Sequence, residues 1–437
     1  MAGRLPVDRA PPRRFWDMLP RAATTFQVAG RAGPRLAHQM NARFLGIEMS
    51  GTDFDFDTPI DRDGTASLKW DGRLGQFGDP GVLPLWVADM DLPAPEAVTR
   101  ALRGRAAHPV YGYTLFPESL FAALTDWMRE RHGWVIERDW VIMAPGVVPS
   151  LAATVLALTQ PGDGVIIQPP VYAPFFSVVR ANGRRLVENP LRMEAGEYRF
   201  DLEHLERCAA GARLLLLCSP HNPVGRVWRP EELSALIEIA RRHGVVILSD
   251  EIHHDLCFPG EDHRVLARLT EDPAAVITAV APSKTFNIPG LGLSAVICPD
   301  PEQRRTLRHV FDSFHVSASN PFSVVGFETA YREGGAWLDA LRPYLKRNRD
   351  LALDFIAGRL PGIAAVRPEG TYLLWLDCCG LGLDDAALRA FFIQRAGLGL
   401  SPGTIFGTGG SGHMRLNLGA PRAVIAQALE RIAAAIG

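Results

Sequence analysis

Lys284 stands out because this chain of 437 residues carries almost all of its positive charge on arginine and has only two other lysines, Lys69 and Lys346. It lies in the stretch VAPSKTFNIPG, between an apolar run and a turn with glycine and proline. A lysine can be deprotonated to a nucleophilic amine, whereas an arginine stays charged in proteins. The residue type and its setting therefore favour a chemical role for Lys284. A solvated surface cation is the alternative.

Five other groups that could bind or react also follow apolar runs. Gly146 opens the turn PGVVPS, whose backbone N–H groups could hold a phosphate at a helix start. Tyr172, Asn222, Asp250 and His253 would add an aromatic ring, an amide, a carboxylate and an imidazole. Taken singly, these groups have ordinary alternatives: a helix start, core packing, a polar turn, a helix cap and a buried histidine. Their joint occurrence favours a common site.

The segments that carry these residues alternate short apolar runs with helical patterns. The runs WVIMAP, GVIIQPP, ARLLLLCSP, VVILSD and AVITAVAPS predict buried strands, and VVPSLAATVLALT and RPEELSALIEIARRHG predict helices between them. This order predicts an α/β fold with a mainly parallel sheet covered on both faces. In such sheets ligands bind outside the carboxyl ends of the strands. The candidate groups are therefore expected on one rim.

The length predicts about two domains. The patterns favour a large domain at 106–330, a smaller α+β domain at 331–437, and a segment at 49–105 that packs with the smaller domain. Residues 1–48 hold eight arginines and only three acidic residues, so we interpret them as an Arg/Pro-rich extension without stable structure. An organelle transit peptide is the alternative, as is translation from Met49.

The composition excludes several classes of function. The net charge is −2, so neither nucleic acid nor an anionic membrane surface is an expected partner. No apolar run reaches the roughly 20 residues that a membrane-spanning helix needs. The six cysteines form no CxxC pair, and no histidine cluster has zinc-ligand spacing. We therefore expect reduced thiols in a cytoplasmic protein and no metal site.

An amine, a carboxylate and a phosphate cradle on one rim match the needs of pyridoxal 5′-phosphate (PLP). That cofactor requires a lysine for its aldehyde, an acidic partner for its ring nitrogen and an anchored phosphate. The sequence therefore predicts PLP as the cofactor.

The segments PGVVPS, IIQPPVYAPFFSVV, CSPHNPVGRVW, SDEIHHDL, APSKTFNIPGL and MRLNLGAPR resemble fold-type I PLP enzymes of the class I/II aminotransferase superfamily. FDFDTPIDRDGTASLKWD, LPLWVADMDLPAP and YGYT further resemble the MalY/PatB-type cystathionine β-lyases. The match runs from about residue 53 to the end of the chain. It implies an aspartate aminotransferase-like fold, an amino-acid substrate and a homodimer with the site at the subunit interface.

The resemblance assigns roles around the cofactor ring. Lys284 would bind the PLP aldehyde covalently and act as the catalytic residue. Asp250 would pair with the ring nitrogen. Asn222 and His253 would lie near the phenolic oxygen, and Tyr172 over the ring face.

The resemblance also assigns the groups that hold the phosphate and the substrate. The phosphate contacts would come from Gly146, Val147, Val148 and Ser283. Arg415 would bind the substrate carboxylate, and Tyr111 would line the substrate site. Tyr113 would reach the cofactor of a partner subunit.

Two positions depart from the broader aminotransferase pattern. His253 stands where many aminotransferases have a tyrosine, and Gly292 stands where many have a phosphate-binding arginine. The β-lyase-like subgroup shares the histidine. We therefore expect the phosphate to be held mainly by backbone N–H groups.

The resemblance implies a PLP-dependent carbon–sulfur β-lyase that converts L-cystathionine-like thioether amino acids to a thiol, pyruvate and ammonia. An aminotransferase acting on an L-amino acid is the first alternative, and residue spacing does not separate the two. The second alternative is a PLP-binding transcriptional regulator. It requires a DNA-binding domain ahead of the PLP domain, for which 48 residues are too few.

Overall fold

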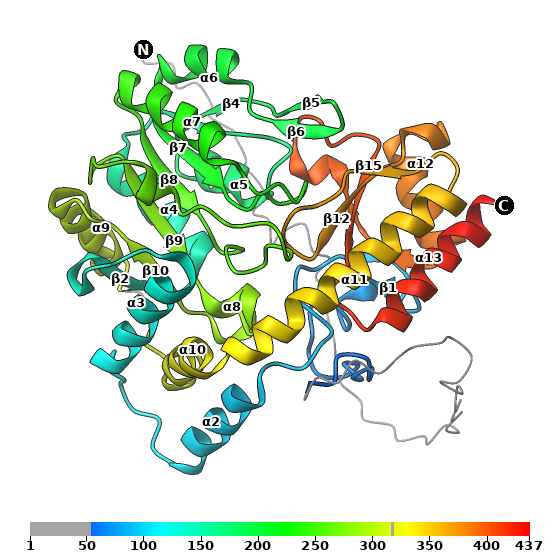
Figure 1. Cartoon of the computed structure of the whole chain (residues 1–437), viewed down its shortest axis with the longest axis horizontal. Coiled ribbons are helices and arrows are strands. Elements are labelled where there is room, and N and C mark those ends of the chain that lie inside the picture. The colour runs from blue at the N-terminus through cyan, green and yellow to red at the C-terminus, as the bar shows by residue number, and fades with distance from the viewer. Residues whose placement is uncertain (1–53, 316–318) are drawn as a thin grey trace, which may run out of the picture.

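The central element of the computed structural model, which describes residues 54–315 and 319–437, is a seven-stranded sheet (Figure 1). The predicted extension at 1–48 lies outside the described residues. The strand order is β2-β10-β9-β8-β7-β3-β4, and β10 alone runs antiparallel to its neighbours. The strands are β2 (Val141–Ala144), β3 (Gly164–Ile167), β4 (Arg185–Glu188), β7 (Ala212–Cys218), β8 (Val246–Asp250), β9 (Val276–Val280) and β10 (Ser294–Ile297). The predicted mainly parallel α/β sheet is confirmed.

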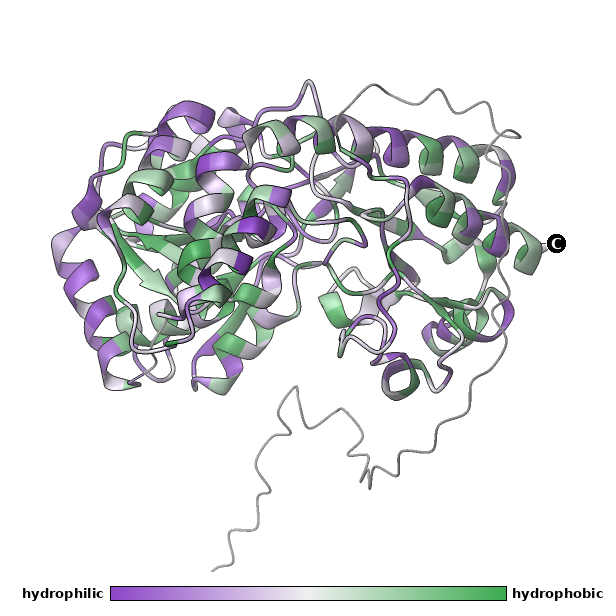
Figure 2. Ribbon diagram, turned by 90° about the horizontal axis from the view of Figure 1, so that it is seen from below, coloured by the Kyte–Doolittle hydropathy of each residue, from purple (hydrophilic) through white to green (hydrophobic). Residues whose placement is uncertain are grey.

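Helices cover both faces of this sheet. One face packs on α4 (Val147–Leu158), α5 (Pro174–Ala181) and α9 (Pro301–Ser313), and the other on α6 (Leu202–Ala209) and α7 (Pro230–His243). Strand β7 explains why both faces are apolar. Leu214 and Leu216 pack on the first face and Leu215 and Leu217 on the second, because successive side chains of a strand point to opposite sides. Figure 2 shows the strands as mostly hydrophobic, with hydrophilic residues on the outer helices.

A second, four-stranded antiparallel sheet lies in the C-terminal part of the chain (Figure 1). Its order is β11-β12-β15-β14, with strands β11 (Ala364–Ala365), β12 (Leu373–Asp377), β14 (Ser401–Pro402) and β15 (His413–Asn417). It packs on the helices α11 (Gly335–Arg359), α12 (Asp385–Ala390) and α13 (Arg422–Ile436). Arg415 lies in the middle of β15, opposite Trp375 on one side and Ser401 on the other.

The segment before the central sheet connects the two parts. After α1 (Arg73–Phe77), the short strand β1 (Leu83–Pro84) pairs with β13 (Leu398–Gly399) of the C-terminal part. The helices α2 (Glu96–Ala107) and α3 (Glu118–His132) then pack against α10 (Pro321–Glu333). The remaining β-strands and α-helices are the hairpin β5 (Arg192–Glu194) and β6 (Glu197–Arg199), and the short helix α8 (Pro282–Thr285). None of the described helices combines the length and apolarity needed to cross a bilayer.

Candidate active site

Five strands of the central sheet end at one edge and carry the predicted residues to it. Gly146 follows β2, Tyr172 follows β3, Asn222 follows β7, Asp250 is the last residue of β8, and Lys284 lies in α8 after β9. These strands run in the same direction, so their carboxyl ends share one rim. Residues as far apart in the sequence as Gly146 and Lys284 therefore lie at the same edge of the sheet.

The Lys284 amine is held against the backbone of the segment 86–91. Its Nζ donates a hydrogen bond to the carbonyl oxygen of Ala88 at 2.6 Å, and the hydroxyl of Tyr372 donates to the same oxygen at 2.9 Å. Burial lowers the pKa of Lys284 to about 8, and the negative charge of Asp89 partly opposes this shift. A lysine with this pKa has a neutral, nucleophilic fraction at ordinary pH.

Arg415 is a buried cation whose side chain has unused bonding capacity. It is 5% exposed. It donates to the Asn222 side-chain oxygen at 2.9 Å, the Trp86 carbonyl at 2.7 Å and the Ser401 hydroxyl at 3.3 Å, whereas its Nε has no partner among the described residues. Burial lowers its pKa to about 10, and it forms no ion pair with any carboxylate of residues 54–315 and 319–437. Such a guanidinium is suited to binding an anionic ligand.

Asp250 and His253 supply a carboxylate and an imidazole that the surrounding protein leaves under-used. Asp250 is 4% exposed and accepts a hydrogen bond from the Ile252 N–H at 3.2 Å. Burial raises the pKa of Asp250 to about 7, so a cationic ligand atom beside it would be needed to keep it fully ionised at neutral pH. Burial also lowers the pKa of His253, whose Nδ1 has no hydrogen-bond partner in the part of the chain that the structure describes. Tyr172 stays neutral as well, because burial raises its pKa.

The start of α4 offers backbone N–H groups to an anion. The helix begins at Val147, directly after Gly146, with no side-chain cap and no acidic residue in its first turn. The N–H groups of Val147 and Val148 have no acceptor within the helix, as at any helix start. Position 292 lies beside this turn, because a Cβ atom on Gly292 would be 3.5 Å from the carbonyl oxygen that precedes Gly146. Ser283 is buried in α8. An anion at this point would therefore be held by backbone groups with no arginine from position 292.

Tyr111 and Tyr113 do not join this cluster within one chain. They lie on the segment between α2 and α3, where Tyr111 is 57% exposed and Tyr113 is fully exposed. The Tyr111 hydroxyl donates to the Ala106 carbonyl at 3.0 Å. The roles predicted for them would require a second chain.

The motif LPLWVADMDLPAP was matched to the family, but no site role was predicted for the backbone of residues 86–91, which form one wall of the site. The carbonyls of Trp86 and Ala88 accept hydrogen bonds from Arg415 and Lys284. Within the segment, Asp89 and Asp91 face a group of cations. The motif LWVADMDL could have indicated this, because two aspartates in an apolar run need buried partners.

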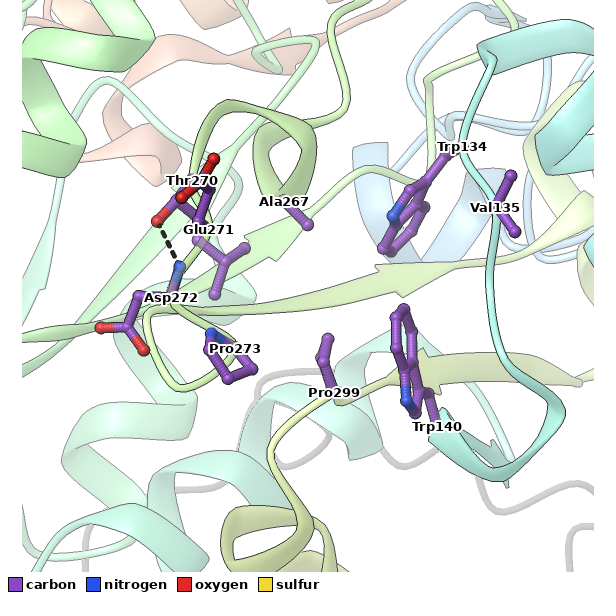
Figure 3. Close-up of a pocket in the computed structure, with 10 residues that line it drawn as sticks. Trp134, Val135, Trp140, Ala267, Thr270, Glu271, Asp272, Pro273 and Pro299 are labelled. Carbon is purple, nitrogen blue, oxygen red and sulfur yellow. Dashed lines mark hydrogen bonds between the residues drawn. The ribbon is translucent and has the colours of Figure 1, made fainter.

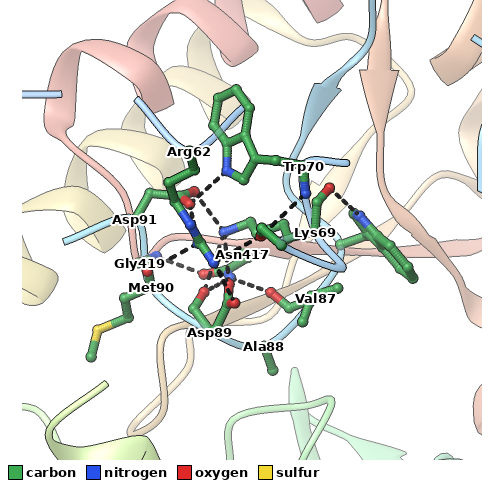
Figure 4. A network of polar contacts seen from close by, with 12 residues as sticks. Arg62, Lys69, Trp70, Val87, Ala88, Asp89, Met90, Asp91, Asn417 and Gly419 are labelled. Atoms are coloured by element: carbon green, nitrogen blue, oxygen red, sulfur yellow. Dashed lines mark hydrogen bonds and ion pairs between the residues drawn. The ribbon is translucent and has the colours of Figure 1, made fainter. Parts of the chain in front are cut away.

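A buried polar network braces this segment (Figure 4). Lys69 is fully buried, and its Nζ lies 2.6 Å from Asp91 and 3.5 Å from Asp89. Arg62 pairs with Asp89 at 2.9 Å and with Asp91 at 2.6 Å, and the Trp70 indole N–H donates to Asp91 at 2.9 Å. Lys69 is thus buried and ion-paired and is not solvated.

Replacing Lys69 with methionine should lower the free energy of unfolding by about 3–5 kcal/mol, because one partner of a buried ion-pair network is removed. Urea denaturation of the purified protein measures this. The matched control is Lys346→Met, because Lys346 pairs with Asp350 at 2.7 Å on the surface of α11 and such pairs contribute only about 0–1 kcal/mol. Similar midpoint shifts in the two variants would contradict the bracing role.

A separate pocket lies at the opposite edge of the sheet (Figure 3). Its volume is about 330 Å³, and the indole rings of Trp134 and Trp140 stand across from the loop 270–273. None of the predicted site residues lines it. The candidate chemistry therefore lies at the carboxyl rim and not in this pocket.

Comparison with known proteins gives a family match over most of the chain. Residues 81–432 match the model for "Aminotransferase class I and II". The chain is 43% identical to the cystathionine beta-lyase PatB of Bacillus subtilis, covering 87% of this chain and 100% of PatB.

Solved structures give a consistent result. Cystalysin from Treponema denticola, whose crystal structure contains a pyridoxal 5′-phosphate cofactor, superposes with a TM-score of 0.84 at 39% identity, over 87% of this chain and 98% of cystalysin. The PLP-bound C-S lyase from Staphylococcus hominis, complexed with the inhibitor L-cycloserine, gives a TM-score of 0.83 at 32% identity, over 89% of this chain and 99% of that protein.

Proposed function

The chain belongs to the class I and II aminotransferase family, and from this premise we propose that it is a PLP-dependent carbon–sulfur β-lyase acting on thioether amino acids such as L-cystathionine. The observation that carries the proposal is that one site holds both a lysine amine of lowered pKa, Lys284, and a buried arginine, Arg415, that has no carboxylate partner among the described residues. The similarity to PatB and to two C-S lyases favours elimination over amino transfer.

The residues at the rim fit PLP. Lys284 would bind the aldehyde, and the N–H groups at the start of α4, with Ser283, would hold the phosphate. Asp250 would lie beside the ring nitrogen. The positive charge of the protonated ring nitrogen would favour the ionised carboxylate and so offset the burial that raises the pKa of Asp250. The unpartnered Nδ1 of His253 and the Asn222 side chain would be available to the phenolic oxygen, and Tyr172 to the ring face. The cofactor would thus give partners to buried polar atoms that have none among the described residues.

When bound, PLP supplies an aldehyde for the substrate amine and an electron sink for charge that develops at Cα. Arg415 binds the substrate α-carboxylate through parallel hydrogen bonds and fixes the direction of the Cα–H bond. Lys284, released as a neutral amine when the substrate amine takes its place on the aldehyde, takes the Cα proton. Asp250 keeps a proton on the ring nitrogen by its negative charge. The Cβ–S bond then breaks, the thiolate leaves with the bonding electrons, and water converts the remaining three-carbon fragment to pyruvate and ammonia.

Incubation of the purified holoenzyme with L-cystathionine in the absence of any keto acid tests the proposal. We expect pyruvate and a free thiol in equal amounts. Amino transfer that begins only when a keto acid is added, with no elimination, would identify an aminotransferase. A purified protein that binds no PLP would contradict both functions.

We further propose that the enzyme is a homodimer in which Tyr111 and Tyr113 complete the site of the partner chain. Both belong to a segment whose apolar side chains are exposed: Val110, Tyr111, Tyr113 and Leu115. Contiguous exposed apolar side chains are typical of surfaces that bind another protein.

The six free cysteines favour a reducing, cytoplasmic location. DNA binding at physiological salt would favour the regulator alternative instead.

Tyr113→Phe should weaken PLP retention about 10- to 100-fold, because one hydrogen bond to a charged group contributes about 1.5–3 kcal/mol. Equilibrium dialysis of the cofactor measures this. In the matched variant Tyr111→Phe, the lost hydroxyl is predicted to serve the substrate, so cofactor retention should change little. Equal PLP affinity in wild type and Tyr113→Phe would count against the placement across the dimer.

A further inference from the structure

Three imidazoles and two carboxylates lie together next to the end of β8, and the proposed chemistry uses none of them. His132 ends α3, and His254 and Asp255 follow β8. His263 pairs with Glu251 at 2.8 Å beside them. All five side chains are at most 7% exposed. A cluster of this kind is costly to bury unless its charges are matched.

Three of these side chains converge on one point. His132 Nε2 lies 2.8 Å from one oxygen of Asp255, and His254 Nε2 lies 3.2 Å from the other. The ligand atoms of the three side chains all lie within 4.8 Å of one another, and the two imidazole centroids are 4.7 Å apart. The three groups could therefore contact a single small ion.

The hydrogen bonding of His254 determines what its inner nitrogen can do. Its Nδ1 lies 2.5 Å from the carbonyl oxygen of Glu251, which can only accept, so Nδ1 carries the hydrogen. In the neutral ring, Nε2 then holds a lone pair. That lone pair faces a carboxylate oxygen at 3.2 Å, and Nε2 makes no hydrogen bond within residues 54–315 and 319–437. Two lone pairs at this distance repel each other unless a cation lies between them.

The charge on Asp255 leads to the same requirement. The Asp255 side chain is only 2% exposed, so an ionised carboxylate at this position needs a compensating positive charge beside it. Its other donors are uncharged: the Trp127 indole N–H at 3.1 Å and the Thr285 hydroxyl at 2.8 Å. No lysine or arginine of the described residues pairs with it. Among the described residues the buried carboxylate thus has no permanent cation within ion-pair distance, and Arg131 acts on it only from farther away.

We propose that His132, His254 and Asp255 bind a divalent transition-metal ion of the Zn²⁺ type. Zinc takes imidazole nitrogens and carboxylate oxygens at about 2.0–2.2 Å, and three protein ligands leave a fourth position for water. The surrounding contacts are those that orient metal ligands: His254 Nδ1 donates to a carbonyl, and Asp255 accepts from Trp127 and Thr285. Sequence spacing did not indicate the site, because 123 positions separate His132 from Asp255.

The ion would have a structural role. It joins the end of α3 to the segment that follows Asp250, and through Asp255 it reaches Thr285, the neighbour of Lys284. Cleavage of the Cβ–S bond needs no contact with it. The metal site and the lyase function can therefore fail independently.

Zinc binding to the holoenzyme, after removal of metal with a chelator and dialysis, tests the site. With zinc chloride as the probe and elemental analysis as the measurement, wild type should retain about one ion per chain, and magnesium chloride should not replace it. Loss of a contact that only orients a metal ligand typically weakens metal binding roughly 10- to 100-fold. His254→Gln and His132→Gln each remove a ligand itself, so each should weaken zinc binding by at least that factor. Zinc should raise the melting temperature of wild type and not that of His254→Gln.

The matched control is His413→Gln, because Asp377, Cys379 and His413 form a second group that could hold an ion. It should keep the wild-type zinc content. Retained PLP absorbance and circular dichroism show whether His254→Gln is folded, and His132→Gln gives a second test if it is not. Loss of zinc only in His413→Gln would overturn the proposal. A wild type without bound zinc would also overturn it, and would mean that a proton on His254 serves as the cation.

Discussion

Lys284→Ala should lower the rate of pyruvate and thiol release from L-cystathionine by at least about 10⁴-fold. Loss of a positioned general base alone typically costs about 10²–10⁴-fold, and the variant also loses the group that binds the PLP aldehyde. Steady-state assays of both products measure the effect. Lys346→Ala is the matched control, because that lysine pairs with Asp350 on the exposed side of α11. A rate within tenfold of wild type in Lys284→Ala would show that another group takes the Cα proton.

The same variant has a second readout that depends on pH. The amine attacks an aldehyde only when neutral, and burial lowers the pKa of Lys284 to about 8. The neutral fraction therefore rises with pH, so the rate at which the apoprotein recaptures PLP should rise with a midpoint near 8. Stopped-flow absorbance measures this rate, and Lys284→Ala should show no such phase. A midpoint near the ordinary lysine pKa of about 10.4 would mean that Lys284 is not desolvated.

The elements that carry the site could be predicted from the sequence, because they are set by local patterns. The run ARLLLLC is apolar at every central position, which fits a strand buried on both faces, and β7 is such a strand. The end of each parallel strand then placed Asp250, Asn222 and Lys284 at one rim. The family predicted from the motifs is confirmed by the match over residues 81–432.

The contacts that depend on distant packing could not be predicted in this way. The pattern of Ser294–Ile297 did not indicate that β10 runs antiparallel, because a buried strand reads the same in either direction. Lys69 gave no sign of full burial, since its partners Asp89 and Asp91 lie about twenty residues away. The approach of His132 to Asp255 joins elements that share no local signal. Local sequence patterns thus identified the residues at the rim. The buried contacts behind the rim, such as those of Lys69 and His132, could be found only from the three-dimensional structure.

Arg415→Lys should lower kcat/KM for L-cystathionine by roughly 10²–10³-fold, mainly through KM. A lysine keeps the charge but cannot form two parallel hydrogen bonds to a carboxylate. Each bond to a charged group is worth about 1.5–3 kcal/mol, and about 1.36 kcal/mol corresponds to a tenfold change. The native guanidinium is held in place by Asn222 and by the Trp86 carbonyl at 2.9 and 2.7 Å, so a shorter, single-headed ammonium would not reproduce its position.

A thioether amine that lacks the α-carboxylate provides the control for this variant. Wild type should process it far more slowly than L-cystathionine, because it cannot use Arg415. Arg415→Lys should process it at nearly the wild-type rate, since the arginine contributes nothing to that substrate. The preference for the carboxylate should therefore shrink in the variant by the same roughly 10²–10³-fold factor that kcat/KM loses. If the substitution slows both compounds equally, Arg415 supports the architecture of the rim and a different group binds the carboxylate.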